Sequence, residues 1–206
     1  SPAPPSANSL CFVFTPTGPF TACEANRTAE WVRSGGVLVY ASEQGDPELD
    51  QVFNVSRING VVSSSKAIAN PILAGVNQVA GADGAIPLDP AGNQVPILRT
   101  PGGFVLGFVS SIGSGRVVVL ADPLILCNGY LEKQDNGRLL ADLLGTDRAT
   151  VAFDEYHHGL TFSDLSPQAW LLTPWGAGMM WLLVAVFVGL LLRGRSFGPL
   201  KPRQVE

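Results

Sequence analysis

The 206-residue sequence is poor in charge and in cysteine. Charged residues make up 15% of the chain and the net charge is only −4, whereas an average soluble domain has about 25% charged residues. No long basic run precedes the C-terminal tail, so we expect no nucleic-acid partner. The three cysteines, Cys11, Cys23 and Cys127, are too few for a disulfide scaffold. A bridge between Cys11 and Cys23 stays open as an alternative to free thiols.

Cofactor-binding motifs are also missing. The Gly113-Ser114-Gly115 segment precedes a predicted strand and opens no helix, so it is not a dinucleotide-binding fingerprint. No Gly-Lys-Ser/Thr phosphate-binding loop occurs anywhere in the chain. The sequence therefore predicts no cofactor.

The few charges are unevenly distributed. The chain has no Asp, Glu, Lys or Arg from Leu165 to Leu192, and Trp175 to Leu192 is an unbroken run of 18 apolar or small residues. Since about 20 apolar residues span a bilayer as a helix, we expect a transmembrane helix over residues 170–192. A buried core helix is the alternative. The expected interfacial anchors are tryptophans at one end and arginines at the other: Trp170, Trp175, Trp181, Arg193 and Arg195.

The basic tail, residues 193–206, gives an orientation. It contains four basic residues and one acid, whereas the rest of the chain is acidic. Because short basic flanks stay in the cytoplasm, we expect a single-pass cell-membrane protein with its larger domain outside the cytoplasm. Ala185 and Gly189 are four residues apart, hence on one helix face, and small residues let helices approach closely in lipid. This face is predicted to pack against another membrane helix.

The segment before the helix reads as an α/β domain, residues 10–165, after a Pro/Ser-rich linker at residues 1–9. Two apolar strands, Leu10–Thr15 and Val37–Ala41, flank a helix that Thr21 can cap, which is the spacing of a parallel crossover unit. We expect a mostly parallel sheet flanked by helices. The alternative is a mixed sheet with a β-rich insert at Asn54 to Ser110.

Further along, Gly103–Ser110 and Arg116–Ala121 read as a hairpin, and Thr150–Phe153 reads as the last strand. Polar residues follow the predicted strands where they end, and in a parallel sheet these ends share one edge. The candidate site residues are carboxylates and imidazoles able to bind a divalent metal or to exchange protons: Asp122, Asp154, Glu155, His157 and His158. The simpler alternative is a hydrogen-bond network that ties the last strand to its loops.

Cys127 is a second candidate. Glutamine amidotransferases place a nucleophilic cysteine on a strand-to-helix elbow, with a later His and Glu. Cys127, His157 and Glu155 offer these residue types, but Ile125 stands where the elbow needs Gly and Glu155 precedes His157. A packed, unreactive cysteine is the alternative interpretation.

Several segments resemble a bacterial membrane-protein family known as domain of unknown function 4350. The segments that carry the resemblance are Phe14-Thr15-Pro16, Glu24-Ala25, Trp31 to Val39, Gly115 to Pro123, Asn128, Asp135-Asn136, Phe153 to Gly159 and Arg195 to Pro199. The resemblance implies a glutamine-amidotransferase-like fold without an established activity, and an upstream membrane helix and strand–helix unit. Cys127 has no counterpart in the family pattern.

These patterns favour a membrane-anchored, non-catalytic ectodomain that acts as an accessory or assembly subunit of a larger membrane protein complex. Its expected partners are the lipid bilayer and other membrane subunits. The alternative is a hydrolase or metal-binding enzyme that uses the polar cluster at the strand ends.

Overall fold

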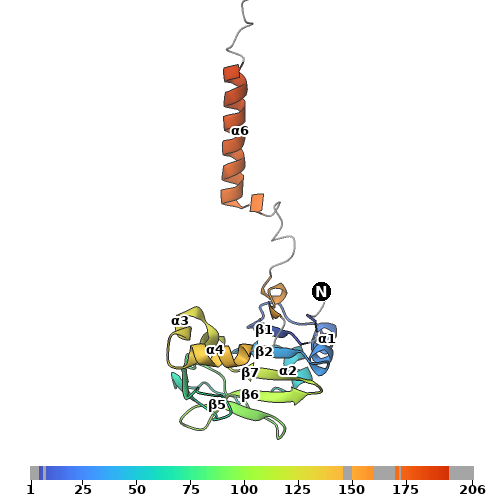
Figure 1. The fold of residues 1–206 in the computed structure, drawn as a ribbon, viewed down its shortest axis with the longest axis vertical. Helices are drawn as coiled ribbons and strands as arrows, with labels where there is room; N and C mark the ends of the chain where they lie inside the picture. The colour runs from blue at the N-terminus through green and yellow to red at the C-terminus, as the bar shows by residue number, and fades with distance from the viewer. Residues whose placement is uncertain (1–4, 7, 146–149, 160–169, 172, 195–206) are drawn as a thin grey trace, which may run out of the picture. The chain divides into compact units, whose positions relative to one another are not determined.

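The computed structural model describes residues 5–6, 8–145, 150–159, 170–171 and 173–194. The chain forms two compact units, Ser1–Gly159 and Leu160–Glu206, which are treated separately below. Figure 1 shows a sheet with helices in the first unit and the long helix α6 in the second.

The first unit opens with a parallel strand–helix–strand motif. Its elements are β1 (Leu10–Phe14), α1 (Ala22–Arg33) and β2 (Val37–Ala41). β1 and β2 pair in parallel. A capping box starts α1: the Thr21 hydroxyl accepts from the Glu24 amide, and the Glu24 carboxylate accepts from the Thr21 amide at 2.9 Å. The predicted crossover unit and its cap at Thr21 are confirmed.

Two further strands, one on each side of the β1–β2 pair, extend the parallel half of the sheet, and short helices lie between them in the chain. The elements are β7 (Gly115–Leu120), η1 (Pro123–Leu126), α3 (Asn128–Leu131), α4 (Asn136–Leu144) and β8 (Val151–Phe153). β7 pairs in parallel with β2, and β8 with β1. The connection from β1 to β2 and that from β7 to β8 run across the sheet in opposite directions. Right-handed crossovers therefore place α1 and α4 on opposite faces of the sheet.

The other half of the sheet is antiparallel. Its elements are α2 (Pro47–Phe53), β3 (Lys66–Ala69), β4 (Gln78–Ala80), β5 (Val95–Arg99) and β6 (Val105–Ile112). The described residues form one eight-stranded sheet in the order β4-β3-β5-β6-β7-β2-β1-β8. The pairings from β4 to β7 are antiparallel.

The expectation of a mostly parallel sheet is therefore wrong, and the alternative of a mixed sheet with a β-rich insert is confirmed. The reason is the length of the connections. The strands between residues 54 and 112 are joined by turns and loops without helices, and parallel neighbours need crossovers of a dozen or more residues, usually through a helix. The predicted hairpin is present as β6 and β7.

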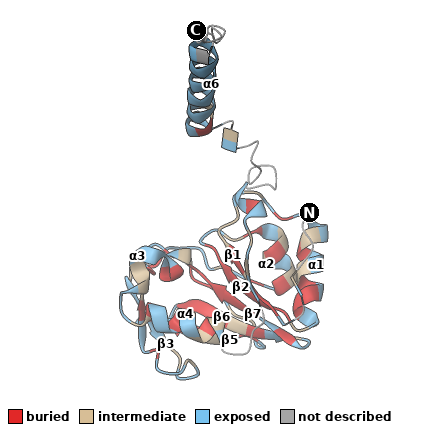
Figure 2. Ribbon diagram, turned by 45° about the horizontal axis from the view of Figure 1, so that its top comes forward, coloured by how far each residue is buried: buried red, intermediate tan, exposed pale blue. Residues whose placement is uncertain are grey.

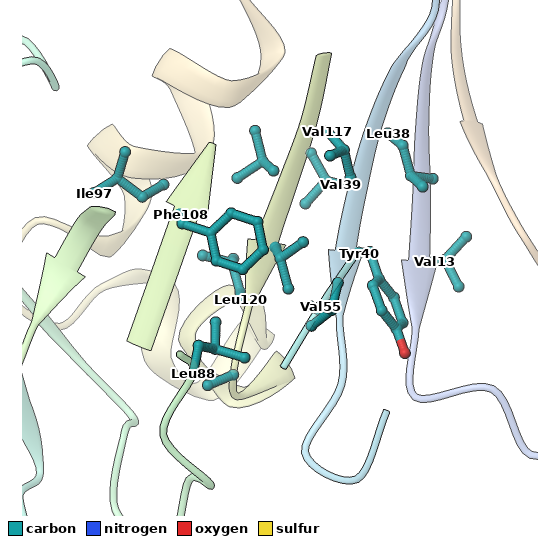
Figure 3. Packing of buried hydrophobic residues seen from close by; sticks show 14 of the residues in the cluster. Val13, Leu38, Val39, Tyr40, Val55, Leu88, Ile97, Phe108, Val117 and Leu120 are labelled. Atoms are coloured by element: carbon teal, nitrogen blue, oxygen red, sulfur yellow. The ribbon is translucent and has the colours of Figure 1, made fainter. Parts of the chain in front are cut away.

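The core lies on both sides of the parallel strands. All five residues of β2 are buried, as expected for a central strand covered on both faces. Figure 2 shows buried residues concentrated along these strands and on the inner sides of the helices. In Figure 3, Val13, Leu38 and Tyr40 pack beside one another, and Phe108 of β6 packs with Leu120 of β7, where the two halves of the sheet meet.

Asn136 ties the antiparallel insert to α4. Its side-chain amide donates to the carbonyl oxygens of Ala80 (2.9 Å) and Ile125 (2.7 Å), and its side-chain oxygen accepts from the Ala80 amide at 2.8 Å. Asp135 accepts from the amides of Asn77 and Gln78, and these hydrogen bonds lower the pKa of its carboxyl. The Asp135-Asn136 pair thus completes the hydrogen bonding of β4 on the side away from β3.

Helix α6 (Pro174–Gly194) contains most of the residues that the structure describes in the second unit. Pro174–Arg193 is long and apolar enough to cross a membrane, since 20 residues at 1.5 Å each span about 30 Å. Its side chains are largely exposed within the chain, so it is not a buried core helix here.

Candidate functional site

The carboxyl ends of the four parallel strands lie along one edge of the sheet. Asp154 follows β8, Thr15 follows β1, Ser42 follows β2 and Asp122 lies two residues beyond β7. This confirms the expected alignment of polar residues. The order of the strands also separates them, because β2 and β1 lie between β7 and β8. At about 4.8 Å per strand, Asp122 and Asp154 belong to different ends of the edge.

A network of polar side chains lies at the carboxyl end of β2. Asp50 accepts from the Tyr40 hydroxyl at 3.0 Å and forms an ion pair with Arg57 at 3.2 Å. Arg57 also donates to the Ser42 carbonyl oxygen at 3.1 Å. Asp46 is 2% exposed and accepts from the Phe20 amide and from two amides in the first turn of α2. Burial and the neighbouring Asp50 raise the pKa of Tyr40, which keeps its hydroxyl as the donor.

Asp122 is a buried cap. It is 1% exposed, and its carboxylate accepts from the Leu124 amide at 2.8 Å at the start of η1. Burial raises the pKa of Asp122 to about 6, the Leu124 amide opposes this rise, and repulsion by Glu43 adds to it. A carboxyl that titrates so close to neutral pH is a candidate functional group on electrostatic grounds.

His157 forms the centre of a second cluster, at the end of β8. It lies in η2 (Tyr156–His158) and is 7% exposed. Its Nδ1 is 2.7 Å from Asp154 Oδ2, and its ring stacks on Phe20 with ring centroids 3.5 Å apart. Its Nε2 is 3.8 Å from Glu24 Oε2 and has no hydrogen-bond partner among the described residues.

The backbone of His157 is also held in place. Its carbonyl oxygen accepts from the amides of Thr17 and Gly18 and from the Thr17 hydroxyl, at 2.8 to 2.9 Å. The loop after β1 therefore fixes η2 against the start of α1. The expected network that ties the last strand to its loops is present.

A cavity of about 180 Å³ adjoins this cluster, beneath α1. Its walls are mostly apolar, and the polar groups Glu24, Arg27, Asp154 and His157 reach it from α1 and from the end of β8. Cys11 also lines it, and burial, with a smaller effect of Asp154, raises the pKa of this thiol to about 12. The Cys11 thiol is therefore protonated and unreactive at neutral pH.

The structure does not gather all predicted residues into one site. Glu155 and His158 are exposed, while His157 is buried. The described residues contain no group of three or more His, Cys, Asp or Glu able to hold a metal ion. Cys127 is exposed, and it caps α3 through its backbone without a side-chain hydrogen bond. All three cysteines are free.

Two important residues were not predicted. Glu24 was recognised only within the family resemblance, although the Thr-x-x-Glu spacing of a capping box marks it in the sequence. Phe20, which stacks on His157, lies in the loop before α1 and has no distinguishing sequence pattern. Their proximity to His157 depends on the long-range contact of this loop with η2.

In α6, the predicted anchors Trp175 and Trp181 are exposed, and Ala185 and Gly189 lie one turn apart on its surface. Trp170 is also exposed, and Arg193 falls in the last turn. Arg195 and the rest of the predicted cytoplasmic tail lie outside the described residues.

The fold and its edge define a mixed α/β domain followed by an apolar helix of membrane-spanning length. The profile of the domain of unknown function DUF4350 matches residues 1–144. The chain therefore belongs to the DUF4350 family. The match ends before β8, so it does not include the Asp154–His157 cluster.

The chain is similar to solved structures at low sequence identity. The mmIFT52 N-terminal domain is 14% identical, with 66% of this chain and 78% of that chain covered at a TM-score of 0.53. A cytoplasmic protein from Salmonella typhimurium LT2 is also 14% identical, with 67% and 71% covered at a TM-score of 0.48. No curated protein matches the sequence.

Proposed function

We propose that this protein is a membrane-anchored ectodomain that acts as a non-catalytic accessory or assembly subunit of a membrane protein complex. The observation that carries the proposal is that the buried carboxylates at the ends of the strands are hydrogen-bonded within the domain. Asp46, Asp50 and Asp122 each accept hydrogen bonds from neighbouring groups of the same domain. Such side chains fix loops to strands and are not held ready for a substrate.

The family resemblance supports the fold without the chemistry. The parallel half, β7-β2-β1-β8, is compatible with a glutamine-amidotransferase-like core. An amidotransferase reaction needs a cysteine and a histidine within hydrogen-bond reach. Cys127 follows β7, His157 follows β8, and none of the contacts of His157 described above is to Cys127. We therefore propose that the domain has a glutamine-amidotransferase-like fold but does not catalyse the amidotransferase reaction.

The C-terminal helix supplies the anchor in this proposal. The run from Trp175 to Leu192 contains no charge, and basic residues follow it. The positive-inside rule supports a cytoplasmic tail and an extracytoplasmic first unit. Protease added to spheroplasts is expected to digest the first unit and to spare a C-terminal tag. Loss of the tag with the first unit intact would show the reverse orientation.

The proposed docking element is the small-residue face of α6 at Ala185 and Gly189. A Leu side chain at both positions would keep a helix away from this face without lowering the hydrophobicity needed for insertion. The double variant Ala185→Leu/Gly189→Leu is expected to lose co-purifying membrane subunits after mild detergent extraction. The matched control, Val184→Leu/Val188→Leu, has the same four-residue spacing on a neighbouring face and should retain them.

Equal subunit recovery for the two double variants would contradict the docking face. Recovery of the wild-type chain alone from native membranes, by mass spectrometry of the intact assembly, would contradict the subunit function itself.

The enzyme alternative rests on the Asp154–His157 pair, because a histidine oriented by a carboxylate is also the arrangement of a general base or of a metal ligand. Addition of Zn²⁺ or Mn²⁺ followed by thermal unfolding tests it. A rise in melting temperature that the His157→Ala/His158→Ala double change abolishes would favour this alternative. No response is the result expected for the accessory subunit.

A further inference from the structure

The cavity beneath α1 contains two acceptors that face each other without a donor between them. The Nδ1 atom of His157 is 2.7 Å from the Asp154 carboxylate, which can only accept. The proton of a neutral ring therefore lies on Nδ1, and Nε2 presents a lone pair. Nε2 is 3.8 Å from Glu24 Oε2, too far for a direct hydrogen bond.

The Glu24 carboxylate is charged at neutral pH. Its hydrogen bonds from the Thr21 hydroxyl and amide are the largest causes that lower the pKa of the Glu24 carboxyl. The Glu24 side chain is 16% exposed and that of His157 is 7% exposed. Glu24 Oε2 already accepts two hydrogen bonds from Thr21, whereas His157 Nε2 is buried without a partner among the described residues. A buried acceptor without a donor costs free energy, so Nε2 is the atom that a donor group would satisfy.

The shape of the cavity restricts what can supply that donor. Its volume is about 180 Å³, and a dry cavity of about 150 Å³ holds one benzene molecule. Phe20, Trp31 and Val13 are among its predominantly apolar walls. One aromatic or aliphatic ring with a single short polar substituent matches this space.

We propose that the cavity binds a compact apolar amine, whose ammonium group donates to both His157 Nε2 and Glu24 Oε2 while its ring packs between α1 and the sheet. An ammonium suits the pair because one nitrogen carries several donors and a positive charge. The arrangement gives Glu24 a second role besides capping α1. Arg27 also lines the cavity, so anions provide a necessary comparison.

The test uses benzylamine and the full chain in lipid nanodiscs, with its histidines labelled with ¹⁵N in the ring. The chain has two histidines, so the exposed His158 serves as an internal control. Benzylamine is expected to shift the His157 ring signals in a saturable manner and to leave those of His158 unchanged. Benzyl alcohol and benzoate, which have the same ring, should bind at least about tenfold more weakly. The alcohol donates only one uncharged hydrogen bond, and the benzoate carboxylate cannot donate and is repelled by Glu24.

The variants separate binding from stability. Glu24→Gln removes the charge but keeps the capping box, since Gln also serves at that position, and it should weaken benzylamine binding about tenfold. Glu30→Gln makes the same charge change at an exposed position of α1 and should leave binding unchanged. Ala152→Leu fills the cavity from β8 and should abolish binding with Glu24 and His157 intact.

Three results would overturn the proposal. The first is the absence of a saturable shift at His157, which would show that a water molecule or a protonated imidazole completes the pair. The second is equal binding of benzylamine and benzoate. The third is unchanged benzylamine binding in Ala152→Leu, which would place the amine outside the cavity.

Discussion

Replacing Asp122 with Asn should stabilise the first unit at neutral pH and have little effect in acid. The carboxyl is 1% exposed, and burial raises its pKa from 3.8 to about 6. The folded protein therefore binds more protons at this position than the unfolded chain does between these two values. The free energy of unfolding accordingly falls as the pH rises from about 4 to about 6, and the loss is complete above the folded-state pKa.

The size of the effect follows from the shift. One pKa unit corresponds to about 1.4 kcal/mol, so a rise from 3.8 to about 6 amounts to at most about 3 kcal/mol at pH 7. Asparagine has no charge to bury, and its side-chain oxygen can still accept from the Leu124 amide, as Asn is a good helix cap. Asp122→Asn should therefore recover most of this free energy.

The assay is thermal unfolding of the full chain in nanodiscs, followed by near-ultraviolet circular dichroism from pH 4 to pH 8. The melting temperature of Asp122→Asn should equal that of the wild type at pH 4 and exceed it by roughly 4–10 °C at pH 7, at about 2–4 °C per kcal/mol. Glu43→Gln removes one cause of the raised pKa and should give a smaller gain in the same direction. A pH-independent difference, or a less stable Asp122→Asn at pH 7, would refute the reasoning.

Three further substitutions or reactions test the packing. Asn136→Ala should lower the free energy of unfolding by about 3–5 kcal/mol in denaturant melts, because it leaves buried backbone groups without partners. Gly115→Ala should prevent stable folding, because its Cβ would overlap two backbone carbonyl oxygens, whereas Gly102→Ala has room and should give near-normal yields of folded protein. Iodoacetamide at pH 8 should label Cys23 much faster than Cys11, whose pKa is about 12, as peptide mass spectrometry can show; equal rates would contradict the burial of Cys11.

The parallel half of the fold was predictable because local signals agree there. Apolar strands, the cap at Thr21 and the glycines that end α1 all point to the same strand–helix–strand unit. The alignment of Asp122 and Asp154 at one edge followed from that topology alone. The strand–helix–strand unit depends on residues close in sequence, which is why one sequence sufficed to predict it.

The antiparallel half was not predictable in detail. β3 and β4 are short and have few buried residues, so their period-two pattern is weak. β4 is positioned partly by Asn136, which is 56 residues away from Ala80 in the chain. Such a side-chain clamp has no local sequence signature, and it decides where the insert joins the sheet.

The polar signature of the family resemblance acquires a physical explanation from these contacts. Asn136 replaces a missing strand partner, Asp122 caps η1 and Asp154 orients His157. Each of these side chains holds a loop or a strand end in place, which needs no reaction. The exception is His157 Nε2, which no described group satisfies. We therefore expect a ligand-dependent function at the cavity beneath α1 and propose that the other polar residues at the strand ends serve the fold.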